Sequence, residues 1–377
     1  MVSMAYDFTP LSLEKLLVPV SRAGEVLTRL DERLARSPVC EGWIGRMHFH
    51  DAVAALWVQG ELVHIEDLVL HDARMDIRAP THELTRAHSM LRTRRKILAN
   101  KADWALSRDG MRQLAGSGAI VEEPDDAAVR GGQGTVGPEA FDGFDDDEST
   151  GPLAGEFAKI DAVLERSRAV LDGLETKTRE SPSASERDSL VYDRDWNEGE
   201  RLSEWNTVAA QTEGLPAVLR AAILSDAWSE IEVLQHASWL GPLFVAALLR
   251  QTAITTNHLA CLNVGLRNIP IERRRSRDRA TRLLAFLDAI HQSALAGLKE
   301  HDRLMLAREQ MERRLKNRRS SSNLPRLIEL VLARPLVSTT MIQSELKLTR
   351  QGVLNLVGEL NLREITGRKR FQAWGVV

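Results

Sequence analysis

The sequence predicts a mainly α-helical protein whose last fifty-odd residues add a small β hairpin. Apolar residues recur at spacings of three and four along most of the chain, which is typical of helices that bury one face. Residues 362–375 are expected to form the hairpin, with strands on either side of a turn at Thr366 and Gly367. Hydrophobic residues make up 43% of the 377 residues, enough to build cores, and this length predicts two or three domains.

The first region, residues 1–120, is predicted to be a series of helices. Its first two apolar faces consist of Leu13, Leu16, Leu17 and Val20, and then of Val26, Leu27, Leu30 and Leu34. An apolar run at 52–58 precedes Gly60, and a helical stripe follows between Leu62 and Ala73. Thr81 starts another helix, which carries Arg86, Arg92, Arg94, Arg95 and Lys96.

A change in composition separates this region from the next at residues 121–155. Between Glu122 and Thr150 the chain holds ten acidic residues, a single basic residue, Arg130, and several glycines. Such a stretch cannot bury enough apolar area to offset the entropy of ordering it. We therefore expect a flexible acidic linker.

A second helical region is predicted at residues 156–322. Four tryptophans concentrate in it and are interpreted as core anchors: Trp196, Trp205, Trp228 and Trp239. The most apolar run, Leu240 to Leu249, is shorter than the ~18 residues of a membrane-spanning helix and predicts a buried helix.

The end of this second region, from Arg273 to Arg319, is basic and helical. Apolar residues fall at heptad-like spacing along it: Leu283, Leu287, Ile290, Ala294, Leu304, Met311 and Leu315. Two interpretations stay open. The face could be the seam of a dimer, or it could pack against its own domain.

The last region, residues 323–377, has a more specific pattern. Leu324 to Leu332 forms a helical face that ends before Pro335, and Leu336-Val337 is a brief extended piece. Ser338 or Thr339 can cap a helix that runs to Leu346, and Thr349 can cap another from Arg350 to Leu360. Two strands follow, at 362–365 and 370–375. Helix, short strand, two helices joined by a turn, and hairpin is the order of a winged helix-turn-helix.

The side chains at the predicted contact positions fit a double-stranded DNA partner. Arg350, Gln351 and Asn355 lie on the outer face of the third helix, near its start, where long polar side chains can reach base edges. Arg368, Lys369 and Arg370 would lie at the tip of the wing, where cations meet phosphates. We therefore predict a DNA-binding protein that acts as a transcriptional regulator through this winged helix, with a homodimer as the expected assembly. A winged helix that only packs against protein is the alternative.

Charge just before this region is consistent with the same prediction. The net charge of the chain is −3, yet residues 267–319 hold fifteen basic and seven acidic residues. The densest run extends from Arg273 to Arg279, and Arg318 and Arg319 directly precede the predicted winged helix. These arginines could add phosphate contacts, or they could form a solvated start of a helix.

Parts of the chain also resemble known bacterial families. The segment from Leu362 to Arg370, LREITGRKR, is similar to the wing that ends many Fic-type proteins. Residues 215–250 resemble the Fic core, in which a motif of the form HPFx[DE]GNGR joins two helices. Residues 55–60, ALWVQG, resemble that family's N-terminal SxxIEG segment. The whole chain also resembles an uncharacterised bacterial family that joins a domain of unknown function to a C-terminal helix-turn-helix.

The resemblance to Fic-type proteins implies transfer of a nucleotide monophosphate to a protein hydroxyl. In that family the motif histidine is the base, the acid binds magnesium, and the glycine-rich nest with its arginine holds phosphates. Here His236 and Gly241 match the motif, but the positions that bind metal and phosphate do not: Leu240 replaces the acid, Pro242 the asparagine, Leu243 the second glycine and Phe244 the arginine. Proline has no amide hydrogen, and the apolar side chains cannot hold phosphate. The resemblance thus implies a catalytically inactive body that serves dimerisation or sensing, with residual nucleotidyl (AMP) transfer at His236 as the alternative.

Other chemical sites have weaker support. His48, His50, His64 and His71 lie close together in sequence, but His64 and His71 are seven residues apart on one helix, so scattered polar positions are favoured over a metal site. The two cysteines, Cys40 and Cys261, form no metal or disulfide motif. We expect no metal and no cofactor. Because neither a signal peptide nor a membrane span is apparent, we also expect a cytoplasmic protein.

Overall fold

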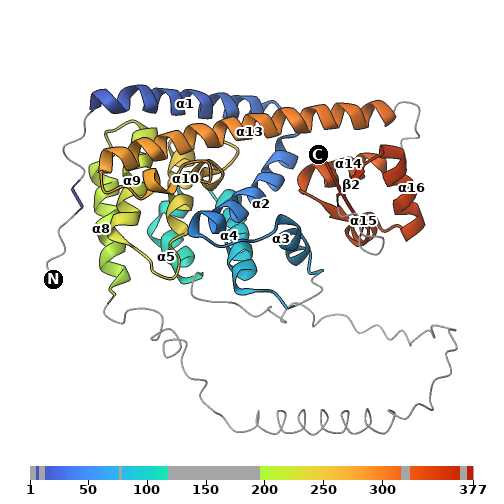
Figure 1. The fold of residues 1–377 in the computed structure, drawn as a ribbon, viewed down its shortest axis with the longest axis horizontal. Helices are drawn as coiled ribbons and strands as arrows, with labels where there is room; N and C mark the ends of the chain where they lie inside the picture. The colour runs from blue at the N-terminus through green and yellow to red at the C-terminus, as the bar shows by residue number, and fades with distance from the viewer. Residues whose placement is uncertain are drawn as a thin grey trace, which may run out of the picture. The chain divides into compact units, whose positions relative to one another are not determined.

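The structure is a computed structural model, and it describes residues 6–7, 13–75, 79–117, 196–315, 323–365 and 372–376 (Figure 1). The chain divides into one unit made of Met1–Val121 and Asn197–Val377, and a second unit, Glu122–Trp196. All helices and strands described below belong to the first unit. The predicted acidic linker at 121–155 lies outside the described residues, and so do the first forty residues of the predicted second region, 156–195.

Two long helices, α1 (Leu13–Ala35) and α13 (Arg279–Leu315), lie side by side (Figure 1). The face of α1 that packs inward carries Leu16, Ala23, Leu27, Leu30 and Leu34, all of them buried. A close approach occurs at Gly297 of α13, where a Cβ atom would lie 2.7 Å from the Leu30 side chain. The Trp43 indole donates a hydrogen bond of 2.9 Å to the Gly297 carbonyl and so joins the pair to the next helix.

That next helix, α2 (Cys40–Gln59), is central to the packing. It contacts α3 (Ile65–Asp72), α4 (His82–Ala99), α11 (Leu262–Leu266), α13 and α14 (Leu324–Ala333). Because it is surrounded, its buried residues include polar ones: Arg46, His48 and Asp51. Asp51 pairs with Arg94 of α4 at 2.6 Å and accepts hydrogen bonds from the Asn263 and Val264 amides at 2.9 and 3.1 Å. This buried carboxylate therefore joins α2, α4 and α11.

The remaining elements of the body are η1 (Trp104–Leu106), α5 (Arg108–Ser117), α8 (Glu198–Gln211), α9 (Ala217–Ile231), α10 (Leu240–Gln251) and α12 (Ile271–Arg274). Helix α10 confirms the buried helix predicted at Leu240–Leu249, since nearly every side chain in it is buried. Trp205, Trp228 and Trp239 are buried as predicted, whereas Trp196 is only half-buried, and Trp205 meets Trp228 edge to face with ring centroids 5.5 Å apart. Both helical regions thus contribute to one continuous core that also includes α14.

The C-terminal elements confirm the predicted order almost residue by residue. They are α14, β1 (Val337–Ser338), α15 (Thr339–Leu346), α16 (Arg350–Leu360), β2 (Arg363–Glu364) and β3 (Ala373–Gly375). The three strands form an antiparallel sheet of order β1-β3-β2, in which Trp374 pairs with Val337 on one side and with Glu364 on the other. The chain is therefore mostly helical, with a small sheet beside its last helices.

The structure bears on two points that the sequence leaves open around α13. Its heptad-like residues from Leu283 to Met311 are buried within the unit, so they do not form a seam exposed for a dimer. The basic run at Arg273–Arg279 lies at the start of α13, whereas the winged helix follows its end. Because 37 helical residues span about 55 Å, this run is remote from the winged helix. Within the described residues, no helix is long and apolar enough to cross a membrane.

Candidate nucleic-acid interface

Local sequence determines the helix-turn-helix formed by α15 and α16. The Ser338 hydroxyl accepts a hydrogen bond from the Met341 amide at 3.2 Å, and the Thr349 hydroxyl accepts one from the Gly352 amide at 3.2 Å. Each cap satisfies an amide that would otherwise lack a partner at the start of a helix. Between the helices, Lys347 adopts the left-handed conformation with a φ of 53°. The caps and this turn fix where each helix begins and ends.

Helix α16 has one buried and one exposed face. Val353, Val357 and Leu360 are buried on the inner face. The three residues predicted to read bases, Arg350, Gln351 and Asn355, are all exposed. The Gln351 side-chain amide donates a hydrogen bond to the Asn355 Oδ1 at 3.1 Å, so the two amides lie next to each other. In Figure 1, α16 lies at the periphery of the winged helix.

The wing is described only at its base. The Ile365 amide donates to the Ala373 carbonyl at 2.8 Å, which continues the β2–β3 pairing toward the tip. Arg368, Lys369 and Arg370 lie outside the described residues, so their predicted role at the wing tip stays a prediction. Among the described residues, Lys347 in the turn and Arg363 in β2 are exposed cations of the same domain.

The winged helix is held against α2 by a joint made largely of backbone atoms. A Cβ atom at Gly42 would lie 3.3 Å from the Leu332 carbonyl carbon, and one at Gly45 would lie 2.8 Å from the Ala333 carbonyl oxygen. The buried Arg46 guanidinium donates to the carbonyls of Arg334 at 2.7 Å and Val376 at 2.9 Å, with longer contacts to Val331 and Pro335.

A carboxylate from the body offsets part of the positive charge at this joint. Glu300 of α13 pairs with Arg46 at 2.9 Å and with Arg303 at 2.7 Å. Arg303 also donates to the Val376 carbonyl at 3.1 Å. Burial lowers the pKa of Arg46 to about 10, which still leaves the guanidinium charged at neutral pH. Sequence reasoning missed Arg46 and Arg303, because a single arginine in a helix gives no signal that carbonyls far along the chain will enclose it.

The structure also shows what surrounds the residues that resemble the Fic motif. His236 Nδ1 lies 2.8 Å from the Glu198 carboxylate and Nε2 lies 3.3 Å from the Ala115 carbonyl, so both ring nitrogens face acceptors. A Cβ atom at Gly241 would lie 2.4 Å from the Trp228 indole, which therefore occupies the space beside that glycine. The Leu240 and Gly241 amides already bond to Ala237 and Ser238, and Pro242 has no amide hydrogen. The start of α10 thus offers no phosphate cradle.

The four histidines considered for metal binding do not converge. His48 is buried and accepts from the Arg94 Nε at 3.2 Å, whereas His71 stacks edge to face with His88. Burial lowers the pKa of both His48 and His50. Across the described residues, no three potential metal ligands come together.

Comparison with known proteins places the chain in a family. A protein of Sinorhizobium fredii, named "Uncharacterized protein y4cF", is 51% identical over 381 residues, which cover 99% of this chain and 100% of that protein. The chain belongs to the same family. Residues 190–316 match the family described as "Protein of unknown function (DUF1612)", and residues 324–377 match "HTH DNA binding domain".

These matches agree with the predicted organisation of this family's members. The helix-turn-helix match begins at Leu324, one residue after the predicted start of the last region at 323. It confirms a C-terminal helix-turn-helix DNA-binding domain joined to a domain of unknown function. The resemblance to Fic-type proteins stays a hypothesis, and so do the domain boundaries at 120, 155 and 322.

Proposed function

We propose that this chain is a transcriptional regulator that binds double-stranded DNA through its C-terminal winged helix. The observation that carries the proposal is the exposed face of α16, where Arg350, Gln351 and Asn355 project from a helix whose opposite face is buried. Arginine can contact the O6 and N7 atoms of guanine, and glutamine or asparagine can contact the N6 and N7 atoms of adenine. Helix α16 would lie in the major groove, with the wing against the backbone.

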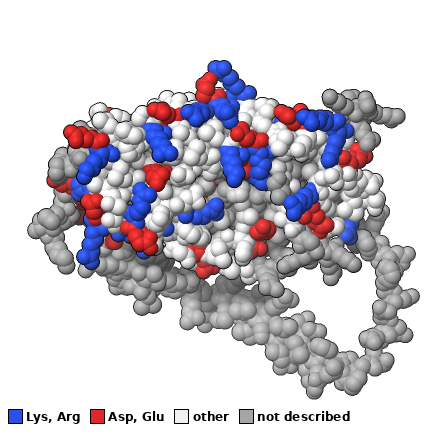
Figure 2. Space-filling view, turned by 45° about the horizontal axis from the view of Figure 1, so that its top comes forward, with Lys and Arg blue, Asp and Glu red and all other residues white. Residues whose placement is uncertain are grey.

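The distribution of charge supports a local DNA contact rather than a broad one. Figure 2 shows basic and acidic residues interspersed on the face that carries α1 and α13, without a continuous basic area among the described residues. Attraction to phosphates would therefore come from the winged helix, through Lys347, Arg363 and the three cations predicted at the wing tip. Because each neutralised phosphate releases counterions, binding should weaken steeply as salt rises.

The test is fluorescence anisotropy of the full chain on labelled fragments from upstream of its own gene, at two salt concentrations, with random DNA as competitor. Changing Arg368, Lys369 and Arg370 together to alanine should weaken binding to every fragment and reduce the slope of log K against log salt by roughly 2–3. Changing Lys15, Arg22 and Arg29, which are exposed on α1, removes the same charge elsewhere and should leave that slope unchanged.

A second pair of variants separates sequence reading from phosphate contact. Gln351→Ala should reduce the preference for the specific fragment over random DNA by about tenfold, since a good bidentate base contact contributes about 1–3 kcal/mol of discrimination. Ser344→Ala, on the exposed surface of α15, is the control. A folded protein that binds no fragment, or that binds all of them equally, would contradict the proposal and favour a winged helix that packs only against protein.

A homodimer remains part of the proposal, because paired recognition helices suit two half-sites about one helical turn apart. The heptad-like residues of α13 from Leu283 to Met311 do not supply its interface, since they are buried within the unit. Sedimentation of the full chain with and without a two-site DNA fragment would determine whether two copies bind together. We also propose that the body is catalytically inactive and serves sensing. The Trp228 indole fills the space beside Gly241 at the start of α10, which supports this part of the proposal.

A further inference from the structure

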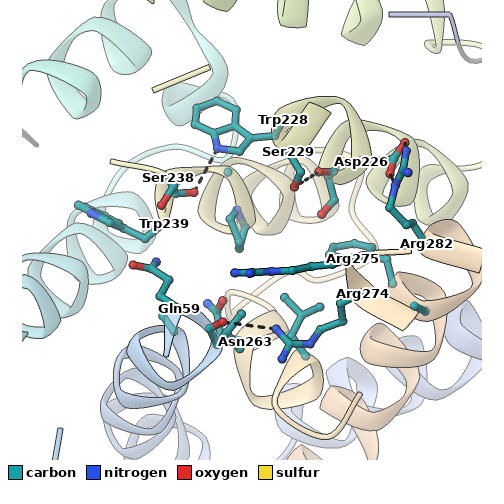
Figure 3. Close-up of a pocket in the computed structure, with 18 of the residues that line it drawn as sticks. Gln59, Asp226, Trp228, Ser229, Ser238, Trp239, Asn263, Arg274, Arg275 and Arg282 are labelled. Atoms are coloured by element: carbon teal, nitrogen blue, oxygen red, sulfur yellow. Dashed lines mark hydrogen bonds and ion pairs between the residues drawn. The ribbon is translucent and has the colours of Figure 1, made fainter. Parts of the chain in front are cut away.

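A cavity of about 240 Å³ lies in the body, away from the winged helix, and its lining comes from α2, α9, α10, α11, α12 and α13. Arg274 and Arg275 lie on one side, and Gln59 and Trp239 on another (Figure 3). A neighbouring hollow shares Val58, Gln59 and both arginines. Arg274 and Arg275 therefore border both hollows.

The charges of the lining do not balance. Arg282 is neutralised by Asp226, with a distance of 2.5 Å from Nε to Oδ1. Arg274 instead donates from Nε to the Ile269 carbonyl at 3.0 Å, and it pairs with no carboxylate among the described residues. Arg275 is exposed, and its side chain forms neither a hydrogen bond nor an ion pair with any described residue. Figure 3 shows its side chain lying across the cavity.

The guanidinium groups of Arg274 and Arg275 lie near each other, and neither forms an ion pair with a described carboxylate. Burial lowers the pKa of Arg274, repulsion from Arg275 adds to that shift, and attraction to Glu272 opposes it. An anion between the two side chains would relieve this repulsion, and a planar carboxylate can accept paired hydrogen bonds from a guanidinium. The rest of the lining includes Trp239, Phe286, Leu266 and Pro242, which offer contact to an apolar group.

We propose that this cavity binds a small organic carboxylate, held at its charged end by Arg275 and Arg274 and at its apolar body by Trp239 and Phe286. A phosphate is a poorer fit. Phosphates often bind to the free amides at the start of a helix. At the start of α10, Pro242 has no amide hydrogen, and the Trp228 indole fills the space beside Gly241. The volume lies below the ~300–1,000 Å³ of pockets for drug-sized ligands, so the ligand is a small metabolite.

Helix α2 joins this cavity to the DNA-binding domain. Ala55, Val58 and Gln59 of α2 line the cavity, and Gly45 and Arg46 of the same helix meet the end of α14. The two contacts are about 20 Å apart along one rigid element. A carboxylate that shifts the end of α2 would shift the position of the winged helix. This coupling, unlike the binding itself, rests on the proposed function.

The first test measures binding alone, by titration calorimetry of the full chain with benzoate, cyclohexanecarboxylate, acetate and inorganic phosphate. Benzoate or cyclohexanecarboxylate should bind at least tenfold more tightly than acetate or phosphate. Arg275→Ala should weaken that binding at least tenfold, whereas Arg277→Ala, an exposed arginine of the same run that does not line the cavity, should leave it unchanged. Absence of binding by all four probes would overturn the proposal, as would equal binding of phosphate or equal affinity of the two variants.

The second test repeats the DNA anisotropy with saturating amounts of the probe that binds best. Coupling predicts a change in DNA affinity of roughly fivefold or more, and DNA must change the affinity for the probe by the same factor. A probe that binds but leaves DNA affinity unchanged overturns the coupling and leaves the site. A chain that binds the probe but no DNA overturns the proposed function instead, so the failures are distinguishable.

Discussion

Two buried arginines, Arg46 and Arg94, join parts of the chain that are distant in sequence. Each pairs with one carboxylate, Glu300 or Asp51, and also donates to backbone carbonyls, while Arg94 Nε donates to the His48 ring. A charge taken out of water is tolerated only where its donors find partners, so each site requires the planar, five-donor guanidinium. The unfolding free energy should therefore depend strongly on these two residues.

Arg46→Lys tests this dependence at the joint with the winged helix. Lysine keeps the charge, but its single nitrogen cannot reach carbonyls at both the end of α14 and Val376. We expect a loss of about 2–4 kcal/mol in the unfolding free energy, measured by urea titration, because buried carbonyls lose their donors. Arg36→Lys, at an exposed position of α1's C-terminal end, should change it by less than about 0.5 kcal/mol. Equal effects of the two changes would contradict this account.

His50 predicts a loss of stability in acid. Burial lowers its pKa from 6.5 to about 4, with Glu300 opposing the shift and Arg46, Arg303 and Arg267 adding to it. The unfolded chain therefore binds a proton between pH 6.5 and 4 that the folded chain does not. This contribution to stability is present above pH 6.5 and is lost as the pH falls toward 4.

The size of this effect can be measured. His50 alone should make the protein about 2 kcal/mol less stable at pH 5 than at pH 7.5, by urea titration. His50→Leu should remove that part of the pH dependence, whereas changing His64, an exposed residue before α3, should not. A pH dependence that is the same in wild type and His50→Leu would rule out this assignment.

At the scale of the element, α2 owes its contact with α14 to two glycines. At Gly45 a methyl group would lie 2.8 Å from a backbone oxygen, which cannot move as a side chain can. We expect Gly45→Ala to cost about 1–3 kcal/mol of unfolding free energy through overpacking. Gly358→Ala in α16, where a Cβ atom meets nothing within 4 Å, should instead stabilise by up to about 1 kcal/mol. Melting temperatures of the two variants should move in opposite directions.

Elements set by local rules could be predicted from the sequence, and α14 to α16 are the clearest case. Ser338 and Thr349 cap helices through amides two or three residues away, so the information lies next to the element that it determines. The exposed positions of Arg350, Gln351 and Asn355 follow from the 3.6-residue period once the helix is assigned. Their role as base contacts stays a prediction.

Elements set by distant partners could not be predicted in the same way. Helix α2 is surrounded by other helices, so its sequence has no clear polar face. Its buried Asp51 meets partners that are more than forty positions away in the sequence. The heptad-like spacing of α13 was ambiguous for a related reason, since a buried stripe has one spacing whether its partner is another copy or α1. The cavity could not be predicted from the sequence, because six elements form it. Two segments that contribute to its lining, Arg273–Arg279 and residues 55–60, were singled out in the sequence for other reasons.

At the scale of the whole unit, the body and the winged helix share one continuous core. We therefore expect them to unfold together. Hydrogen exchange should give the Val331 and Leu332 amides of α14 the same opening free energy as buried amides of α2, such as those of Ala52 and Ala54. Amides on the exposed face of α16 serve as the internal reference for local fraying. A lower opening free energy for α14 than for α2 would show that the winged helix separates on its own.

The joint between α2 and the winged helix is formed mainly by hydrogen bonds to main-chain atoms. Arg46 and Arg303 bond to the carbonyls of residues 331, 334, 335 and 376, and a carbonyl is present whatever the side chain. Substitutions on the outer face of α16 would leave this attachment intact. Relatives could therefore diverge in the DNA sequences that they bind while the rest of the fold stays the same. A winged helix whose recognition helix is taken from another relative should still pack against α2 in the same way.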